Sequence, residues 1–367
     1  MRGRHEMHIA SVATAYPPYR YPQSVITEAL KAFRKNKSTE SNESRLMDRL
    51  HSNCGVEFRH LMFPIDSLGR FSGFGASNDA WIEGALKLGQ QAVTTALDRA
   101  GLKPSDISAI FFCSTTGLAT PSIDARLTNL MNFPTNIKRT PIFGLGCVAG
   151  AAGISRAADY VRAYPKQYAL LLAVELCSLT WQETDESIGN LVASGLFGDG
   201  AAAVVLAGDA TPLASKTAEA DRPCPRVLDT RSTLYPGTEH LVGWKFKDNG
   251  FNVVLSSEIP DLVNKYLRSN VDEFLADNDL TVKEICSFIF HSGGPKVLEA
   301  MEQSLDLPPG ALESSWASLR EVGNLSSASV LSIMEDYLLH KPGKPGEHSV
   351  LAAMGPAFCS ELVLLQW

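Results

Sequence analysis

The sequence contains no segment that would cross a membrane and no cysteine pair of the kind that binds zinc. No window of its 367 residues approaches the roughly 18 uninterrupted apolar residues of a membrane span, and the first residues lack the apolar stretch of a secretory signal. The seven cysteines are widely spaced, without a C-x-x-C pair, which predicts reduced thiols and neither a zinc site nor a disulfide framework. We therefore expect a cytoplasmic protein with no stable membrane insertion and no metal.

An excess of positive charge is also absent. With 33 Lys and Arg against 40 Asp and Glu, the net charge is −7, which argues against a nucleic-acid partner. Arg45, Arg49 and Arg59 nevertheless form a local basic patch, which indicates either a solvated face or an anion-binding rim. Hydrophobic residues make up 45% of the chain, enough for a large core divided between two domains.

An internal repeat predicts how those domains arose. Residues 102–115 resemble residues 280–293 at a constant offset of 178 residues, and a helical pattern precedes each copy. Two copies of a helix, a loop and a buried strand predict a duplicated α/β chain, with chance similarity of apolar strands as the alternative. We place the first half at residues 1–222 and the second at residues 223–367. The matched positions include Leu102 with Leu280, Asp106 with Glu284 and Cys113 with His291.

One cysteine stands out from the rest of the chain. Residues 142–154 read I-F-G-L-G-C-V-A-G-A-A-G-I, so Cys147 is surrounded by apolar and small residues. The glycines predict a tight turn that delivers Cys147 to the start of a buried helix. There the positive end of the helix dipole favours the thiolate. The alternative is a small buried hydrophobe, which is the usual role of a single intracellular cysteine.

Two more polar residues end apolar segments in the second half. His291 follows the strand pattern of residues 285–290, and Asn324 precedes the apolar helix of residues 330–339. Alone, each is typical of a structural histidine or a helix cap. Together with a cysteine they indicate a catalytic site. A neighbouring histidine can hold the cysteine as thiolate, and an asparagine amide next to the histidine gives two hydrogen-bond donors for one oxyanion.

Four segments of the chain resemble the type III polyketide synthases, the chalcone synthase-like members of the thiolase fold; they read G-C-V-A-G-A-A, L-F-G-D-G-A-A-A-V-V, F-I-F-H-S-G-G-P and E-V-G-N-L-S-S-A-S-V-L. The resemblance implies duplicated α/β halves in a five-layered αβαβα arrangement and a homodimer. It implies Cys147 as the nucleophile, with His291 and Asn324 as its partners. The implied substrates are acyl-CoA and malonyl-CoA, with no cofactor.

The resemblance also implies which residues contact the substrate. Phe197 matches the aromatic gate between an acyl-CoA tunnel and the cavity, and Arg49 matches a cation that binds CoA phosphates. Two neighbouring positions where the family has cations are Leu46 and Asn53 here. The other expected substrate-binding residues are Thr115, Ala119, Cys177, Thr180, Val253 and Ser326.

The expected reaction is the iterative decarboxylative condensation of malonyl-CoA onto an acyl group held on Cys147, followed by cyclisation. Because Ala119, Cys177 and Val253 are small for a cavity wall, we expect a medium- or long-chain fatty acyl starter and an alkylpyrone or alkylresorcinol product. One alternative is a malonyl-CoA-primed synthase with a naphthalene-type product. Another is a single-extension enzyme like β-ketoacyl carrier-protein synthase III. A non-catalytic thiolase-fold subunit is disfavoured because Cys147 is kept.

Overall fold

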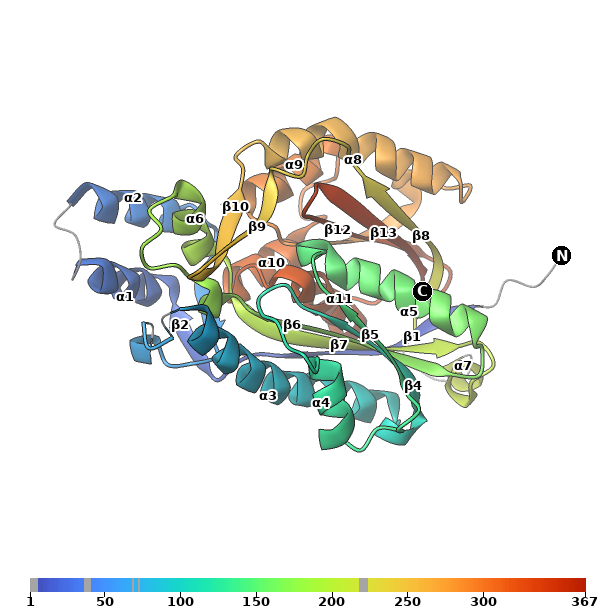
Figure 1. The fold of residues 1–367 in the computed structure, drawn as a ribbon. Coiled ribbons are helices and arrows are strands. Elements are labelled where there is room, and N and C mark those ends of the chain that lie inside the picture. Colours follow the sequence, from blue (N-terminus) through green and yellow to red (C-terminus); the bar gives the residue numbers. More distant parts are fainter. Residues whose placement is uncertain (1–5, 36–40, 68, 72, 218–223) are drawn as a thin grey trace.

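The structure is organised as two groups of strands, with helices between them and on both outer faces (Figure 1). This computed structural model describes residues 6–35, 41–67, 69–71, 73–217 and 224–367. The first group consists of β1 (Met7–Ala15), β4 (Ile107–Cys113), β5 (Lys138–Ile142), β6 (Tyr168–Leu176) and β7 (Asp199–Gly208). The second consists of β8 (Arg226–Leu234), β11 (Ile285–Phe290), β12 (His348–Gly355) and β13 (Cys359–Gln366).

Helices complete the five layers that the sequence predicts. The central layer contains α5 (Ala149–Ala163) and α11 (Ser329–His340), one from each half of the chain. The first outer layer contains α3 (Phe74–Ala100) and α4 (Ile123–Leu130), and the opposite layer contains α8 (Ile259–Ala276) and α9 (Pro295–Ser304) (Figure 1). The protein therefore has the αβαβα arrangement of the thiolase fold. The predicted division between residues 222 and 223 lies outside the described residues.

The strands join edge to edge in the order β11-β12-β13-β8-β1-β7-β6-β4-β5. Strands β4, β5 and β6 run parallel, whereas β7 is antiparallel to both β6 and β1. The two groups meet where β1 pairs with β8 through Met7 with Val227 and His8 with Arg226. Every residue of β6 and of β7 is buried, as expected for strands covered by helices on both faces.

The two copies of the repeat have the same local structure. Gly101 and Asp279, which lie 178 residues apart, are both left-handed, with φ of 67° and 57°. Each is followed by a short 3₁₀ turn, η2 (Pro104–Asp106) or η5 (Val282–Glu284), and then by β4 or β11. The carboxylate at the end of each turn accepts a hydrogen bond from the backbone N–H three residues earlier, at 2.7 and 2.8 Å. The predicted duplication is confirmed.

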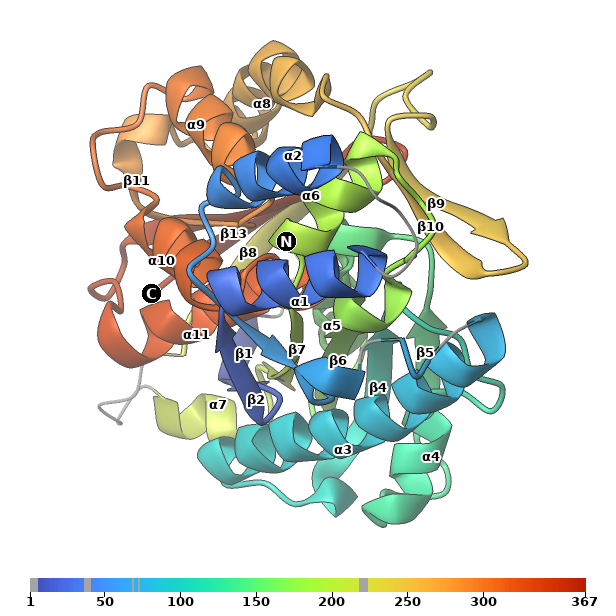
Figure 2. The ribbon, with the colours of Figure 1, turned by 90° about the vertical axis from the view of Figure 1, so that its left-hand side faces the viewer.

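One end of the layered core is covered by further elements, which face the viewer in Figure 2. These are α1 (Gln23–Lys35), α2 (Ser41–Ser52), α6 (Ile188–Leu196), the small sheet of β2 (Tyr19–Pro22) and β3 (Phe58–Leu61), and the hairpin of β9 (Val242–Lys247) and β10 (Gly250–Leu255). Asp248 and Asn249 form the turn that joins β9 to β10. The remaining elements are η1 (Ile65–Ser67), η3 (Gly146–Val148), η4 (Cys177–Thr180), α7 (Pro212–Thr217), α10 (Glu313–Val322) and η6 (Ser326–Ala328).

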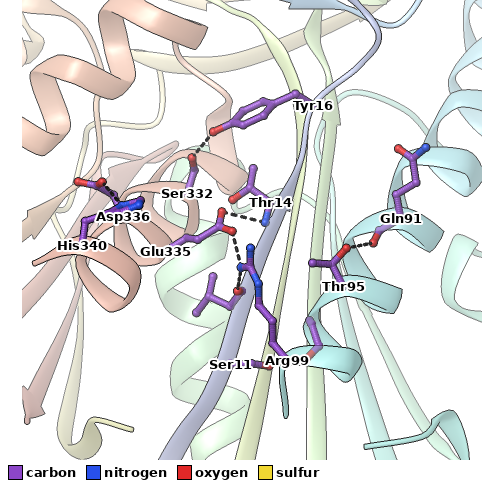
Figure 3. Close-up of polar contacts among 12 residues, drawn as sticks. Ser11, Thr14, Tyr16, Gln91, Thr95, Arg99, Ser332, Glu335, Asp336 and His340 are labelled. Carbon is purple, nitrogen blue, oxygen red and sulfur yellow. Dashed lines mark hydrogen bonds and ion pairs between the residues drawn. The ribbon is translucent and has the colours of Figure 1, made fainter. Parts of the chain in front are cut away.

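Polar contacts fasten α11 of the second half to the first half (Figure 3). The Glu335 carboxylate accepts a hydrogen bond from the backbone N–H of Thr14, at 2.9 Å, and forms an ion pair with Arg99 of α3. The Tyr16 and Ser332 hydroxyl oxygens lie 2.7 Å apart. These contacts hold α11 against β1 and α3, and therefore limit how the halves can move relative to each other.

Several elements of the structure were not predicted from the sequence. The helical pattern before the first copy of the repeat belongs to α3, which begins at Phe74, and the buried strand of that copy ends at Cys113. Helices α4, α6, α9 and α10 and the edge strand β5 had not been predicted. In β5 four of the five residues are exposed, so its sequence carries no apolar alternation.

Gly150 in α5 should be essential for the close packing of the central layer. A Cβ atom there would lie 2.2 Å from the backbone oxygen of Ser327, so Gly150→Ala should destabilise the protein by about 1–3 kcal/mol. The matched control is Gly75→Ala in α3, where no atom lies within 4 Å of the added Cβ; it should leave stability unchanged or slightly raised. Urea unfolding measures both variants, and equal effects would contradict this account of the packing.

Candidate active site

Cys147 lies on the tight turn that the sequence predicts. It is the middle residue of η3, immediately before α5. Gly144 and Gly146 have φ of 93° and 57°, and a Cβ atom on Gly146 would lie 2.6 Å from the ring of Pro356. Glycine is required at residue 146 for both reasons: the left-handed backbone and the neighbouring ring. The turn leaves Cys147 partly accessible from a cleft, with protein on its other sides.

The cleft brings Cys147, His291 and Asn324 together, and we call it the outer cavity. It has about 1830 Å³ of empty space, part of it open to solvent. Phe197 also lines it, as do the apolar side chains of Ile188, Val242, Leu255 and Ile259. The three residues expected to carry the chemistry therefore share one cavity, although they come from both halves of the chain.

Asn324 is held in one orientation. Its side-chain oxygen accepts hydrogen bonds from the backbone N–H of Ser326, at 2.7 Å, and from the Ser329 hydroxyl, at 3.4 Å. Its amide nitrogen donates to the carbonyl oxygen of Gly293, at 3.2 Å. An amide nitrogen carries two hydrogens, and the second has no acceptor among the described residues. It is therefore available to a bound molecule.

His291 is a neutral imidazole at the end of β11. Its backbone N–H donates to the carbonyl oxygen of Ala352, at 2.9 Å. Burial lowers the pKa of His291 to about 4, so the ring is uncharged at neutral pH. In the part of the chain that the structure describes, the buried Nδ1 atom has no hydrogen-bond partner. The ring can accept a proton and can donate one.

The protonation of Cys147 differs from the sequence expectation. Burial raises the pKa of the thiol to about 12; the Ser326 hydroxyl, 3.5 Å from Sγ, lowers it and the Glu175 carboxylate raises it. These surroundings therefore disfavour the predicted thiolate, because the loss of hydration is the largest effect on this pKa. A neutral thiol and a neutral imidazole face the cavity together.

A second, inner cavity adjoins this site. It has about 650 Å³ of empty space, which includes space open to solvent, and Phe197 lines both cavities, as expected of a gate between them. Two tryptophans, Trp181 and Trp244, also line it, and the Trp244 indole donates to the Thr115 hydroxyl at 3.2 Å. The expected substrate-binding residues that line the inner cavity are Thr115, Cys177, Thr180, Phe197, Val253 and Ser326.

Two expected binding residues lie elsewhere. Ala119 lines neither cavity and packs beside the core between α3 and the first sheet. Arg49 is exposed near the end of α2, where its backbone oxygen accepts a hydrogen bond from Asn53, and its side chain lines neither cavity. Lys296 at the start of α9 is the cation that lines the outer cavity. Arg59 is buried and lines the inner cavity, so it belongs to no surface patch.

Glu175, the penultimate residue of β6, is not among the site residues expected from the sequence. The carboxylate is fully buried and accepts hydrogen bonds from the Thr115 backbone N–H, at 3.1 Å, and from the Thr116 hydroxyl, at 2.8 Å. It also accepts from the Ser114 and Ser327 hydroxyls. Burial raises the pKa of Glu175 to about 7. The signal in the sequence was an acidic residue at the end of a wholly apolar strand.

The described residues contain no group of three or more His, Cys, Asp or Glu side chains placed to hold a metal ion. In the same part of the chain, no helix combines the length and the apolar character needed to cross a membrane.

Comparisons with known proteins agree with this geometry. The family described as chalcone and stilbene synthases matches with its N-terminal domain at residues 2–210 and its C-terminal domain at residues 227–366. The 1,3,6,8-tetrahydroxynaphthalene synthase of Streptomyces peucetius is 48% identical over 360 residues, covering 98% of this chain and 93% of the relative. A putative chalcone synthase of Bacillus subtilis is 37% identical, covering 98% of each. The solved 1,3,6,8-tetrahydroxynaphthalene synthase of Streptomyces coelicolor superposes with a TM-score of 0.88 at 31% identity, covering 98% of this chain and 99% of that one.

The rate at which Cys147 is alkylated should continue to rise as the pH is raised above 7. Because the pKa of its thiol is raised to about 12, the reactive thiolate is a small fraction at pH 7. The rate with iodoacetamide should therefore rise about tenfold per pH unit between roughly pH 7 and 9. Peptide mass spectrometry separates Cys147 from the exposed Cys286, which serves as the control. A rate that is already constant below pH 7 would show that the proton has passed to His291 in the resting enzyme.

Proposed function

Because the chain belongs to the chalcone and stilbene synthase family and is a type III polyketide synthase, an acyltransferase, we propose that it uses malonyl-CoA as both starter and extender and forms a naphthalene-type product. The observation that carries this proposal is a group of hydroxyl side chains in the lining of the inner cavity. Its hydroxyl groups belong to Thr115, Thr116, Ser178, Thr180, Ser194 and Ser326.

The chemistry of the growing chain explains why those hydroxyls matter. A chain built from malonyl units has a carbonyl group on every second carbon, and each carbonyl can accept a hydrogen bond. Four of these hydroxyls, those of Thr116, Ser178, Thr180 and Ser194, already donate to protein acceptors. The Thr115 hydroxyl accepts from Trp244 and keeps its own hydrogen for a carbonyl of the chain. An alkyl chain would leave that donor without a partner, which is unfavourable in a buried site. Trp181 and Trp244 add bulk to a wall that the sequence suggested was made of small residues. The similarity to enzymes named for a tetrahydroxynaphthalene product supports the same choice.

The proposed reaction begins with acyl transfer. The Cys147 sulfur attacks the thioester carbonyl while its proton passes to His291, and the proton leaves with CoA as its thiol. Transfer of the proton between two neutral partners keeps the net charge of the buried pair at zero. This route is consistent with a thiol whose pKa is raised and an imidazole whose pKa is lowered.

Carbon–carbon bond formation follows from decarboxylation. Loss of CO₂ from malonyl-CoA leaves an enolate, whose oxygen accepts hydrogen bonds from His291 and from the free amide hydrogen of Asn324. The enolate carbon attacks the thioester on Cys147 and the cysteine leaves as thiolate. The extended chain on CoA then returns to Cys147, and repeated cycles precede ring closure.

A fatty acyl starter is the second candidate, and one observation favours it. The inner cavity is also lined by Ile26, Leu30 and Leu61, an apolar group that an alkyl chain could contact. Each buried CH₂ group would contribute about 0.8 kcal/mol to binding. This candidate predicts alkylpyrones or alkylresorcinols.

The division of labour in the site can be tested with single substitutions. Cys147→Ala should abolish polyketide formation but retain slow decarboxylation of malonyl-CoA, because both enolate donors remain. Asn324→Ala should lower decarboxylation by about 10²–10³, as for removal of one oxyanion donor. The control is Cys359→Ala, because that thiol donates to the Pro356 carbonyl and lines neither cavity. Undiminished polyketide formation by Cys147→Ala would refute its role as nucleophile.

Product analysis separates the candidate functions. Malonyl-CoA alone should give a naphthalene-type product, detected by mass spectrometry, and added lauroyl-CoA should not be incorporated. Cys177→Phe, which fills the inner cavity, should shift the products to shorter chains, whereas Cys177→Ala should preserve them. Alkylated products from lauroyl-CoA would establish the second candidate instead. Products of a single extension would identify a β-ketoacyl synthase III-like enzyme.

A further inference from the structure

Arg59 of β3 is a buried cation that contacts the gate. Its side chain is 3% exposed, its Nη1 donates to the backbone oxygen of Phe197 at 2.7 Å, and its Nε donates to the Gln23 side chain at 2.9 Å. Burial lowers the pKa of Arg59 to about 10, with Asp199 acting in the opposite direction, so the group remains charged at neutral pH. Its Nη2 has no partner among the described residues. Such a group is expensive to bury, which suggests a role besides stability.

The gate and the catalytic amide are joined through their backbones. The N–H of Asn324 donates to the carbonyl oxygen of Leu196, and the N–H of Gly198 donates to the carbonyl oxygen of Asn324, both at 2.9 Å. Phe197 therefore forms a one-residue parallel bridge with Asn324. A displacement of the Phe197 peptide would move the peptide that carries the Asn324 amide.

Arg59 touches both sides of this bridge. While its guanidinium holds the Phe197 carbonyl, its aliphatic part packs against Gly323, the residue before Asn324. A Cβ atom on Gly323 would lie 3.3 Å from Cγ and Cδ of Arg59 and 2.8 Å from the Leu196 oxygen. Gly323 has φ of 73°, so both its backbone and its surroundings exclude a larger residue.

We propose that Arg59 is a positioning residue that sets the Asn324 amide relative to the Phe197 gate, and so aligns the amide with the enolate oxygen. The proposal rests on the proposed role of Asn324 in decarboxylation. A charged donor to a carbonyl is stronger than a neutral one, and misplacement of a catalytic group by about 1 Å can reduce the rate by about 10²-fold. Although Arg59 also lines the inner cavity, its effect on decarboxylation would pass through the bridge between Phe197 and Asn324 and not through contact with the reacting atoms.

A double-mutant cycle on malonyl-CoA decarboxylation tests this coupling. Arg59→Met should lower kcat by about tenfold or more in the native background, with a smaller change in KM. In the Asn324→Ala background the same substitution should change kcat by less than about twofold, because the amide that it misplaces is gone. Gln23→Ala is the control: it removes the other partner of Arg59 and should leave kcat within about twofold of the native value.

The possible outcomes are distinct. Equal losses from Arg59→Met in both backgrounds would indicate a general structural effect and overturn the positioning role alone. A native decarboxylation rate in Asn324→Ala would overturn the proposed role of Asn324 and this inference with it. Arg59→Lys, which keeps a buried cation and one donor, should recover part of the activity that Arg59→Met loses. If Arg59→Met does not fold, Arg59→Lys takes its place in the cycle, with the same dependence on Asn324 expected.

Discussion

The close approach of α5 to the segment that leads into α11 is the contact on which the site depends. At Gly150 the two backbones are so near that a methyl group would overlap the Ser327 carbonyl oxygen. This contact joins the halves of the chain three residues after Cys147 and three residues after Asn324. The hydrogen bond from Thr14 and the ion pair with Arg99, both made by Glu335, hold α11 to β1 and α3. The distance between Cys147 and the Asn324 amide is therefore set by packing at the centre of the protein, where rearrangement is most costly.

Burial governs the electrostatics of the site as well as its geometry. The protein surroundings that reduce the hydration of Cys147 and His291 favour the uncharged forms of both. Charge then develops only as the reaction proceeds, at places where donors are already fixed. The amide of Asn324 is an example, since three hydrogen bonds hold it before any substrate arrives. Such prior alignment means that little reorganisation accompanies the formation of the enolate.

The sequence predicted those parts of the molecule that local patterns determine. The repeat, the buried strands and the glycine turn at Cys147 follow from periodicity and from the special backbone freedom of glycine, and the motifs led to His291 and Asn324 in one cavity. Side-chain direction was not predictable. Ala119 and Arg49 line neither cavity, whereas Trp244 lines the inner cavity from a hairpin that is distant in sequence. The homodimer implied by the resemblance stays a prediction.

The duplicated architecture also has a consequence for the symmetry of the chemistry. The turns η3 and η6 begin 180 residues apart and lead into α5 and α11, which likewise begin 180 residues apart. Cys147 and Ser326, 179 residues apart, are thus near-counterparts, and their Sγ and Oγ atoms face each other at 3.5 Å. The counterpart of His291 in the first half is Cys113, which is wholly buried and donates to the Ala149 carbonyl oxygen. The proposed nucleophile and base therefore lie at positions whose near-counterparts in the other half are a serine and a buried cysteine. The serine supplies the hydroxyl beside the sulfur of Cys147.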